Sequence, residues 1–518
     1  MVKKTSKTKG DGPSKEIRAE KIETKNLKVL EEYIIEDNDV SASIKICNDP
    51  DEYIPIYDIS YPKIEEATRA ILDSIREKIV TELAFNTNDI LNPNESSEVR
   101  ENFTEKAVKL LSEELPNLNK NDVKILIGIL AQESLGLGPI EFMLKDSSLE
   151  EIVINSANEP IWVYSRKYGW LKSSIKLIDE AKIYNYSAQI GRRVGTQITN
   201  LSPLMDAYLT TGDRANATLF PISSNGNTLT IRKFARKPWT ITDFILMNTI
   251  SPEVAAFLWL AIQFEMNIVC AGGTASGKTS FLNVLTMFMP PTQRILSIED
   301  TREIQLPHFL HWVPLTTRPP NIEGKGEVSM LDLMINALRM RPDKMIVGEI
   351  RRSKEAEVLF EAINTGHSVY STLHANTAEE TLKRLINPPI NIPISLLTSL
   401  HLIAVMHRDR RKRTRRVLEI TELIPSGGLD DMKIELNNIF RWVPSKDKII
   451  EWGKSNRVMN EIKLFSGMED KDIQKSLDEK KQILVWMAKR NMNDIDKVGR
   501  VISDYYKDPE RILKLVRR

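Results

Sequence analysis

The sequence around residue 275 has the pattern of a phosphate-binding loop. Gly272 to Thr279 read Gly-Gly-Thr-Ala-Ser-Gly-Lys-Thr, which fits G-x-x-x-x-G-K-[ST] in full. A short apolar run, Asn267–Ala271, precedes the loop, and apolar residues at helical spacing follow it over Ser280–Met289. In the order strand, glycine loop and helix, backbone N–H groups and the helix N-terminus face a bound phosphate. The pattern therefore predicts that the chain binds ATP.

Each position of this loop has a predicted role. The glycines allow the backbone N–H groups to turn inward. Lys278 is expected to reach the β- and γ-phosphate oxygens, and the Thr279 hydroxyl is expected to bind Mg²⁺. The predicted nucleotide-binding residues are Gly272, Gly273, Thr274, Ala275, Ser276, Gly277, Lys278, Thr279 and Ser280.

Acidic residues follow two apolar runs of strand type downstream of the loop. Ile295–Ile298 is followed by Glu299, with Glu303 four residues later, and Met345–Gly348 is followed by Glu349. A carboxylate at such a strand end can orient and deprotonate a water molecule, or hold the hydration shell of Mg²⁺. We expect Glu299 to be the general base with Glu303 as the alternative, and Glu349 to serve the metal. Either strand-end acid could instead cap a helix, but two beside an intact phosphate loop favour catalysis.

Two of the six histidines flank the next apolar run, Ser368–Thr372. His374 lies at the predicted carboxyl end of this strand, where the γ-phosphate would be sensed, so a catalytic role is favoured. His367 lies at its start, and a functional and a structural role remain equally open.

The phosphate loop belongs to a predicted doubly wound α/β domain, because apolar strands at 267–271, 294–298, 344–348 and 368–372 alternate with helical segments. Upstream, short β-branched runs indicate a mixed sheet, and apolar residues at four-residue spacing indicate a long helix from Ala67 to Leu83. The predicted organisation is a disordered basic tail (1–28), a helical N-terminal region (29–138), an α+β domain (139–236), a linker (237–240), an ATPase core (241–425) and a C-terminal helical region (426–518).

Composition narrows the class of protein. The 72 Lys and Arg balance 71 Asp and Glu, so net charge does not indicate nucleic acid. The two cysteines, Cys47 and Cys270, offer neither a disulfide framework nor a C-x-x-C pair. The start of the chain lacks the apolar core of a signal peptide, and no apolar run approaches the roughly 20 residues of a membrane span. We expect a soluble, intracellular protein that reaches a membrane through a partner.

One strongly basic run, Arg408–Arg416, carries seven basic residues in nine. Read alone, it could bind nucleic acid. It lies in a predicted turn between the strands Leu402–Met406 and Val417–Leu423, without interleaved aromatic residues. A solvated turn or an acidic protein partner is therefore favoured, and no nucleic acid is expected.

Four segments together resemble the motifs of the secretion ATPases of type II and type IV systems. The similarity covers about residues 140–425 and is closest to the archaeal branch that assembles archaella and type IV pili. The matching segments are the Walker A loop (Gly272–Thr279), the Asp box (Glu299–Glu303), the Walker B strand (Ile346–Glu349) and the His box (Gly366–His374).

The resemblance implies an α/β protein with a RecA-like P-loop C-terminal domain, an α+β N-terminal domain and a helical C-terminal tail. It further implies a homohexamer that uses ATP and Mg²⁺, in which Arg214 and Arg232 of the N-terminal domain reach the γ-phosphate. Arg339 and Arg341 are weaker candidates. The implied partners are a polytopic membrane platform protein and accessory cytoplasmic filament proteins, at the inner face of the cell membrane.

Two departures and two alternatives accompany this resemblance. Arg352 stands where the family tends to carry glycine, and the zinc-binding cysteines of many bacterial members are absent. Archaellum and pilus are not distinguished. The alternatives are a traffic ATPase for protein or DNA secretion and a nucleotide-gated scaffold that does not hydrolyse ATP.

Overall fold

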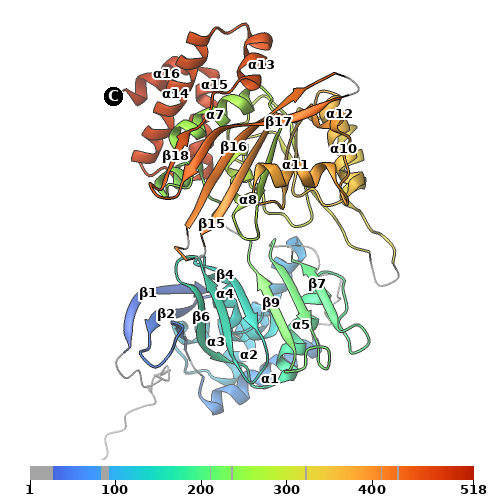
Figure 1. Ribbon diagram of the computed structural model, residues 1–518. Coiled ribbons are helices and arrows are strands. Elements are labelled where there is room, and N and C mark those ends of the chain that lie inside the picture. The colour runs from blue at the N-terminus through green and yellow to red at the C-terminus, as the bar shows by residue number, and fades with distance from the viewer. Residues whose placement is uncertain are drawn as a thin grey trace, which may run out of the picture. The chain divides into compact units, whose positions relative to one another are not determined.

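The computed structural model describes residues 27–62, 64–82, 93–209, 212–234, 237–320, 324–409, 411–412, 414–428 and 431–517. The chain divides into two compact units, Met1–Ala235 and Arg236–Arg518, and each is described by itself (Figure 1). The predicted basic tail, residues 1–28, lies outside the described residues except at its last two positions.

In its described part, the first unit contains a nine-stranded sheet of order β1-β2-β3-β6-β5-β4-β9-β8-β7. Only β3 and β6 pair in parallel; the other described neighbours in this sheet are antiparallel. The strands are β1 (Lys28–Asp37), β2 (Val40–Asn48), β3 (Ile56–Ser60), β4 (Leu149–Ile154), β5 (Pro160–Ser165), β6 (Gly169–Lys176), β7 (Leu204–Tyr208), β8 (Arg214–Thr218) and β9 (Thr228–Arg232).

The prediction of a helical region from residue 29 is wrong for its first part, because β1, β2 and β3 precede the first helix. In β2, Val40, Ala42, Ile44 and Ile46 are buried at every second position. This two-residue period is the mark of a strand with one face on the core. The alternation is visible in the sequence, but it is short. The strands with which β2 pairs are determined by tertiary contacts.

α1 confirms the long helix predicted from Ala67 to Leu83, and two further helices, α2 and α3, follow it. Buried side chains of α1, α2 and α3 form an apolar cluster of their own, which includes Leu72, Ile75, Phe103 and Leu126. The helices are α1 (Glu66–Glu82), α2 (Pro93–Glu114), α3 (Lys120–Leu135), α4 (Ile140–Lys145) and α5 (Glu180–Arg193).

The described part of the second unit is built on a nine-stranded sheet of order β12-β11-β13-β14-β10-β15-β16-β17-β18. The first six strands in this order, β12, β11, β13, β14, β10 and β15, are parallel. The strands β16, β17 and β18 extend the sheet antiparallel. The strands are β10 (Ile268–Gly272), β11 (Ile295–Glu299), β12 (Trp312–Thr316), β13 (Lys344–Val347), β14 (Ser368–Leu373), β15 (Leu402–Asp409), β16 (Thr414–Ser426), β17 (Lys433–Val443) and β18 (Lys448–Glu451).

Helices cover both faces of this sheet. Along β10, Ile268 and Cys270 belong to one apolar cluster, whereas Val269 and Ala271 belong to another. The first cluster includes residues of α6–α8 and of the C-terminal helices, and the second includes residues of α9–α12 (Figure 1). The helices are α6 (Ile241–Leu246), α7 (Pro252–Gln263), α8 (Lys278–Thr286), α9 (Met330–Leu338), α10 (Ser353–Asn364), α11 (Ala378–Ile386), α12 (Ile394–Leu397), α13 (Arg457–Ser466), α14 (Asp470–Lys489), α15 (Ile495–Lys507) and α16 (Pro509–Val516).

The second unit is therefore the expected RecA-like α/β domain with a helical C-terminal tail. One detail of the prediction is wrong: after residue 426 the chain first adds β17 and β18 to the sheet, and helices begin only at Arg457. The tail packs on α7, where Trp259 meets the edge of the Tyr505 ring of α15 at 5.4 Å between ring centroids. Trp259 also stacks on Phe288, which follows α8, at 5.3 Å. None of the described helices combines the length and hydropathy that crossing a bilayer requires.

Candidate active site

The phosphate loop joins β10 to α8, which confirms the predicted order of strand, loop and helix. Gly277 has a φ of +91°, in the left-handed region that favours glycine. A Cβ atom at Gly272 would lie 2.4 Å from Ser276 Oγ and 2.7 Å from the Met406 carbonyl oxygen. Both glycines are thus required, one by backbone conformation and the other by close packing.

Lys278 begins α8 and is only 8 % exposed. Its Nζ donates to the Gly273 carbonyl at 3.2 Å, and no ion pair forms at this ammonium within the described part of the chain. Burial lowers the pKa of Lys278, while the charges of Glu349 and Glu303 oppose that shift. A buried cation whose printed partners are a carbonyl and an imidazole, at a helix N-terminus with its backbone N–H groups, fits an anionic phosphate.

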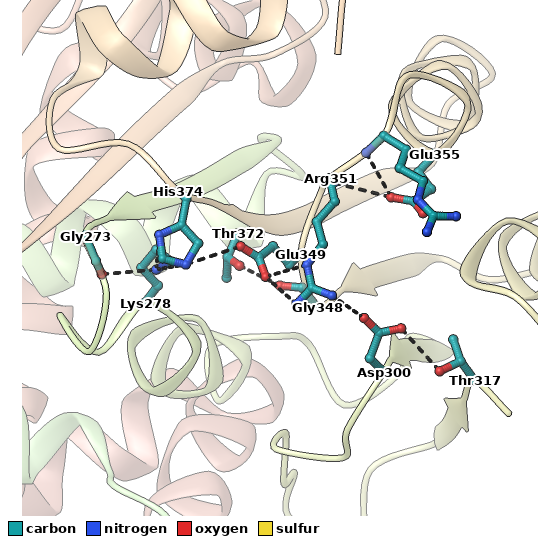
Figure 2. Close-up of polar contacts among 11 residues, drawn as sticks. Gly273, Lys278, Asp300, Thr317, Gly348, Glu349, Arg351, Glu355, Thr372 and His374 are labelled. Atoms are coloured by element: carbon teal, nitrogen blue, oxygen red, sulfur yellow. Dashed lines mark hydrogen bonds and ion pairs between the residues drawn. The ribbon is translucent and has the colours of Figure 1, made fainter. Parts of the chain in front are cut away.

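His374 connects Lys278 to Glu349. The imidazole Nε2 lies 3.4 Å from Lys278 Nζ and 3.5 Å from Glu349 Oε1, as Figure 2 shows. Partial burial and the neighbouring Lys278 charge lower the pKa of His374 in spite of Glu349. The ring is therefore neutral near pH 7 and can both accept and donate a hydrogen bond.

Arg351 continues these contacts beyond Glu349. Its Nε and Nη2 lie 2.9 and 2.7 Å from Glu349 Oε2, and its Nη1 lies 2.7 Å from Asp300 Oδ2. Thr317 Oγ1 then donates to Asp300 Oδ1 at 3.2 Å (Figure 2).

These polar residues follow the order of the strands. Lys278, His374, Glu349, Asp300 and Thr317 come after β10, β14, β13, β11 and β12, which is the order of neighbours in the sheet. Because the five strands are parallel, their carboxyl ends meet at one edge, where α/β proteins bind ligands. The topology therefore brings the Walker A, Walker B and His box segments together.

The two candidate bases occupy different environments. Glu299 is 2 % exposed, and its Oε1 accepts the backbone N–H groups of Glu303 at 2.9 Å and Ile304 at 3.0 Å. Burial raises the pKa of Glu299 to about 7. Glu303 is exposed, and its charge acts on Lys278. Glu299 therefore holds the turn after β11, whereas the Glu303 side chain is exposed and its charge opposes the lowering of the Lys278 pKa.

In the first unit, Arg214 and Arg232 are direct partners across the antiparallel strands β8 and β9. Directly opposed residues share one face of a sheet, and both arginines are exposed. Arg214 also donates from Nε to Asp206 Oδ1 at 2.9 Å and lies over the Tyr208 ring, 5.3 Å from its centroid. The two predicted arginines thus lie next to each other on one face of the sheet.

Residues 136–417, more than half of the chain, match the family profile described as Type II/IV secretion system protein. The chain belongs to this family. An uncharacterized protein of Methanocaldococcus jannaschii is 36 % identical over 386 residues, covering 73 % of this chain and 69 % of the relative. Type IV secretion system protein PtlH of Bordetella pertussis is 30 % identical over 264 residues, covering 47 % of this chain and 77 % of the relative.

Among solved structures, this type II/IV secretion system protein is similar to the VirB11 ATPase of the Brucella suis type IV secretion system, solved in complex with sulphate. The TM-score is 0.28 at 24 % sequence identity, and the match covers 54 % of this chain and 91 % of that structure.

Some predicted residues of this type II/IV secretion system protein lie away from the carboxyl edge. His367 precedes β14, and its Nδ1 lies 3.1 Å from the Ala362 carbonyl oxygen. Arg339 caps the end of α9, and Arg341 lies between α9 and the start of β13. Since β13 and β14 run parallel, their amino ends lie at the opposite edge of the sheet from Glu349. The structure does not bring these three residues to the phosphate loop.

Sequence reasoning on this type II/IV secretion system protein missed the role of Asp300 and Arg351. Asp300 lies within the Asp box next to Glu299, and Arg351 follows the Walker B acid Glu349 by two residues. For Asp300 the available signal was its position directly after a strand end, at the same edge as the phosphate loop; no such signal marks Arg351, which lies four residues beyond the end of β13. Nothing in the sequence indicated that these two residues, 51 positions apart, form an ion pair.

Proposed function

We propose that this chain is a motor that hydrolyses ATP to assemble an archaeal surface filament, either an archaellum or a type IV pilus. One observation carries the proposal: Lys278 of the intact phosphate loop contacts His374, and His374 contacts Glu349. Membership in the type II/IV secretion system protein family supports this interpretation of the site. The relative from Methanocaldococcus jannaschii supports the archaeal assignment.

The phosphates of ATP would be held by the loop Gly272–Thr279, the Lys278 ammonium and the N-terminus of α8. Thr279 and Glu349 would hold Mg²⁺, directly or through its water molecules. Bound Mg²⁺ neutralises phosphate charge that develops during transfer. His374 sits between the ammonium and the metal-binding acid, where it can report the state of the γ-phosphate to β14.

The water that attacks the γ-phosphate needs a carboxylate within hydrogen-bond reach. Glu303 suits this role better than Glu299, because Glu299 is buried and already accepts two backbone N–H groups. Glu303 is exposed and close enough to influence the Lys278 charge. We therefore assign the general base to Glu303 and the support of its turn to Glu299.

Arg214 and Arg232 are proposed to act on the γ-phosphate when the α+β region 139–236 closes over the ATPase core, 241–425. A guanidinium stabilises the charge that spreads over the transferred phosphoryl group. Cycles of closure and release in a homohexamer would then transmit force.

The proposed setting is the cytoplasmic face of the cell membrane. There the motor would act on a polytopic membrane platform protein, together with accessory filament proteins and without nucleic acid. A deletion strain of the source organism, examined by electron microscopy, would lack a surface filament and regain it from the wild-type gene but not from Lys278→Ala.

A second candidate function is protein secretion, because PtlH is named as a type IV secretion protein and shares 30 % identity. The same deletion strain separates the two functions: intact filaments with one missing extracellular protein would favour secretion. A scaffold that binds ATP without hydrolysing it would show no ATP turnover, which the next experiment measures.

The direct test of the enzymatic proposal is phosphate release by the purified full chain. We expect steady-state release from ATP that requires Mg²⁺ and disappears in Lys278→Ala. No release from the wild type, with or without lipid vesicles and across protein concentrations that allow oligomers, would leave only the scaffold.

A further inference from the structure

The basic run Arg408–Arg416 is not used by the proposed function, although it lies at the β15–β16 turn beside the phosphate loop. One of its arginines has a structural role. Arg416 is 7 % exposed, and its Nε and Nη2 each lie 2.8 Å from a carboxylate oxygen of Asp447. This arginine also lowers the pKa of Asp447. Arg416 therefore anchors the hairpin.

Arg415, the preceding residue, points to the phosphate loop. Its Nε donates to the Ala275 carbonyl at 3.2 Å, a contact between residues 140 positions apart. A Cβ atom at Gly277 would lie 3.3 Å from Arg415 Cδ and 3.7 Å from its Nε. The guanidinium thus lies directly against the loop residues that precede Lys278.

The sheet fixes this position. β15 pairs with β10 up to Gly272 and Met406, so the hairpin leaves the sheet beside the strand that enters the phosphate loop. Arg408 and Arg415 are partners across the hairpin. Pairing with Arg408 across the hairpin and the ion pair of the next residue, Arg416, with Asp447 together hold the backbone of Arg415. Arg415 is therefore placed by regular structure rather than by a free turn.

The terminal nitrogens of Arg415 have no hydrogen-bond partner among the described residues. Only Nε makes a hydrogen bond within the described part of the chain, and no carboxylate there pairs with this guanidinium. The side chain is exposed. Counted over the described residues, four N–H donors and a full positive charge thus remain beside a loop that also carries Lys278.

We propose that Arg415 is a nucleotide-binding residue that donates to the phosphates held by Gly272–Thr279. The inference rests on the proposed function, because it requires that this loop binds ATP. The ligand class is the polyphosphate chain of a nucleoside triphosphate. The competing explanation is that Arg415 only supports the loop through the Ala275 carbonyl.

The experiment measures the affinity of the full chain for ATP by calorimetry, with Mg²⁺, at low and high salt. Because a hydrogen bond between charged groups is lost, Arg415→Ala should weaken binding about tenfold or more. The salt dependence of binding should also become shallower, because one cation no longer contributes. Arg411→Ala is the matched control, since Arg411 is exposed on the same hairpin and its backbone N–H contacts Asp409. It should leave the affinity unchanged.

Two conservative variants separate charge from loop support. Arg415→Gln keeps an N–H donor for Ala275 but removes the charge, so it should bind ATP as weakly as Arg415→Ala. Arg415→Lys keeps the charge and should retain most of the affinity. The thermal unfolding midpoint of each variant should match the wild type, because the side chain is exposed.

Binding by Arg415→Gln at the wild-type affinity would overturn the proposal in favour of loop support. Equal affinities of Arg415→Ala and Arg411→Ala would overturn it as well. Failure of the proposed function gives a different pattern: the wild type itself would not bind ATP, and Lys278→Ala would change nothing.

Discussion

Glu349 and Arg351 form an ion pair in which one carboxylate oxygen accepts both N–H groups. Glu349 Oε2 lies 2.9 Å from Arg351 Nε and 2.7 Å from Nη2, while Oε1 faces His374 at 3.5 Å. Arg351 is tied in turn to Asp300. The guanidinium therefore holds the Walker B acid so that its second oxygen faces His374.

The first prediction concerns this orientation. Arg351→Ala should lower the turnover number about tenfold, as expected when the support of the proposed metal-binding acid Glu349 is lost, with ATP affinity little changed. Phosphate release and calorimetric ATP binding measure the two quantities. Arg352→Ala is the control, because this neighbour is also exposed and its backbone N–H contacts Glu355. Equal losses in both variants, or a loss of affinity alone, would contradict the role of Arg351.

The second prediction separates the two candidate bases. Glu303→Gln should lower turnover by roughly 10²–10⁴-fold, the usual contribution of general base catalysis, while ATP still binds. Glu299→Gln should keep turnover within a few fold, because the amide oxygen can accept the same N–H groups of Glu303 and Ile304. The measurement is again phosphate release beside ATP binding. A large loss of turnover in Glu299→Gln with an unchanged unfolding midpoint would return the base to Glu299.

That several candidate site residues lie together could be predicted from the sequence, because parallel strands bring their carboxyl ends to one edge. Lys278, Glu349 and His374 each follow an apolar run, and the topology alone brings them together. Arg351 and Arg415 could not be predicted in this way. Their partners Asp300 and Ala275 depend on side-chain directions and on which strands are neighbours, which the local pattern does not specify.

The fold shows the same limit. The alternation of apolar residues in β10 and β14 is absent because both faces are buried, yet short apolar runs between helices sufficed to predict these strands. The N-terminal strands β1–β3 were missed, since their pairing with each other and with β6 is decided by contacts distant in sequence. β17 and β18 were missed for a similar reason: they add to a sheet edge that only the folded core provides.

The third prediction is a pH dependence that comes from Glu299. Burial raises its pKa from 4.5 to about 7, so the folded chain keeps a proton that the unfolded chain has lost. The resulting stabilisation is complete below about pH 4.5 and is lost as the pH rises through 7, with a size on the order of 3 kcal/mol. Unfolding midpoints of wild type and Glu299→Gln at pH 5 and 8 test this. The difference between the two proteins should depend on pH; parallel profiles would show that Glu299 does not titrate in this range.

The fourth prediction has the opposite sign and concerns Lys480, which is fully buried on α14. Its Nζ donates to Ser476 Oγ at 2.7 Å and lies 5.6 and 4.9 Å from the ring centroids of Trp259 and Tyr505. Burial lowers the pKa of Lys480 from 10.5 to about 7. The unfolded chain thus binds the extra proton between pH 7 and 10.5, and the wild type should gain stability as the pH rises through this window. Lys480→Met fills a similar volume without an ammonium, so it should raise the unfolding midpoint at pH 7 and remove this contribution to the pH dependence. Lys481→Met, on the same helix but with Nζ paired to Glu253 at 2.9 Å, is the control and should not raise the midpoint. A lower midpoint for Lys480→Met at pH 7 would show that the ring and hydroxyl contacts outweigh the cost of burying the charge.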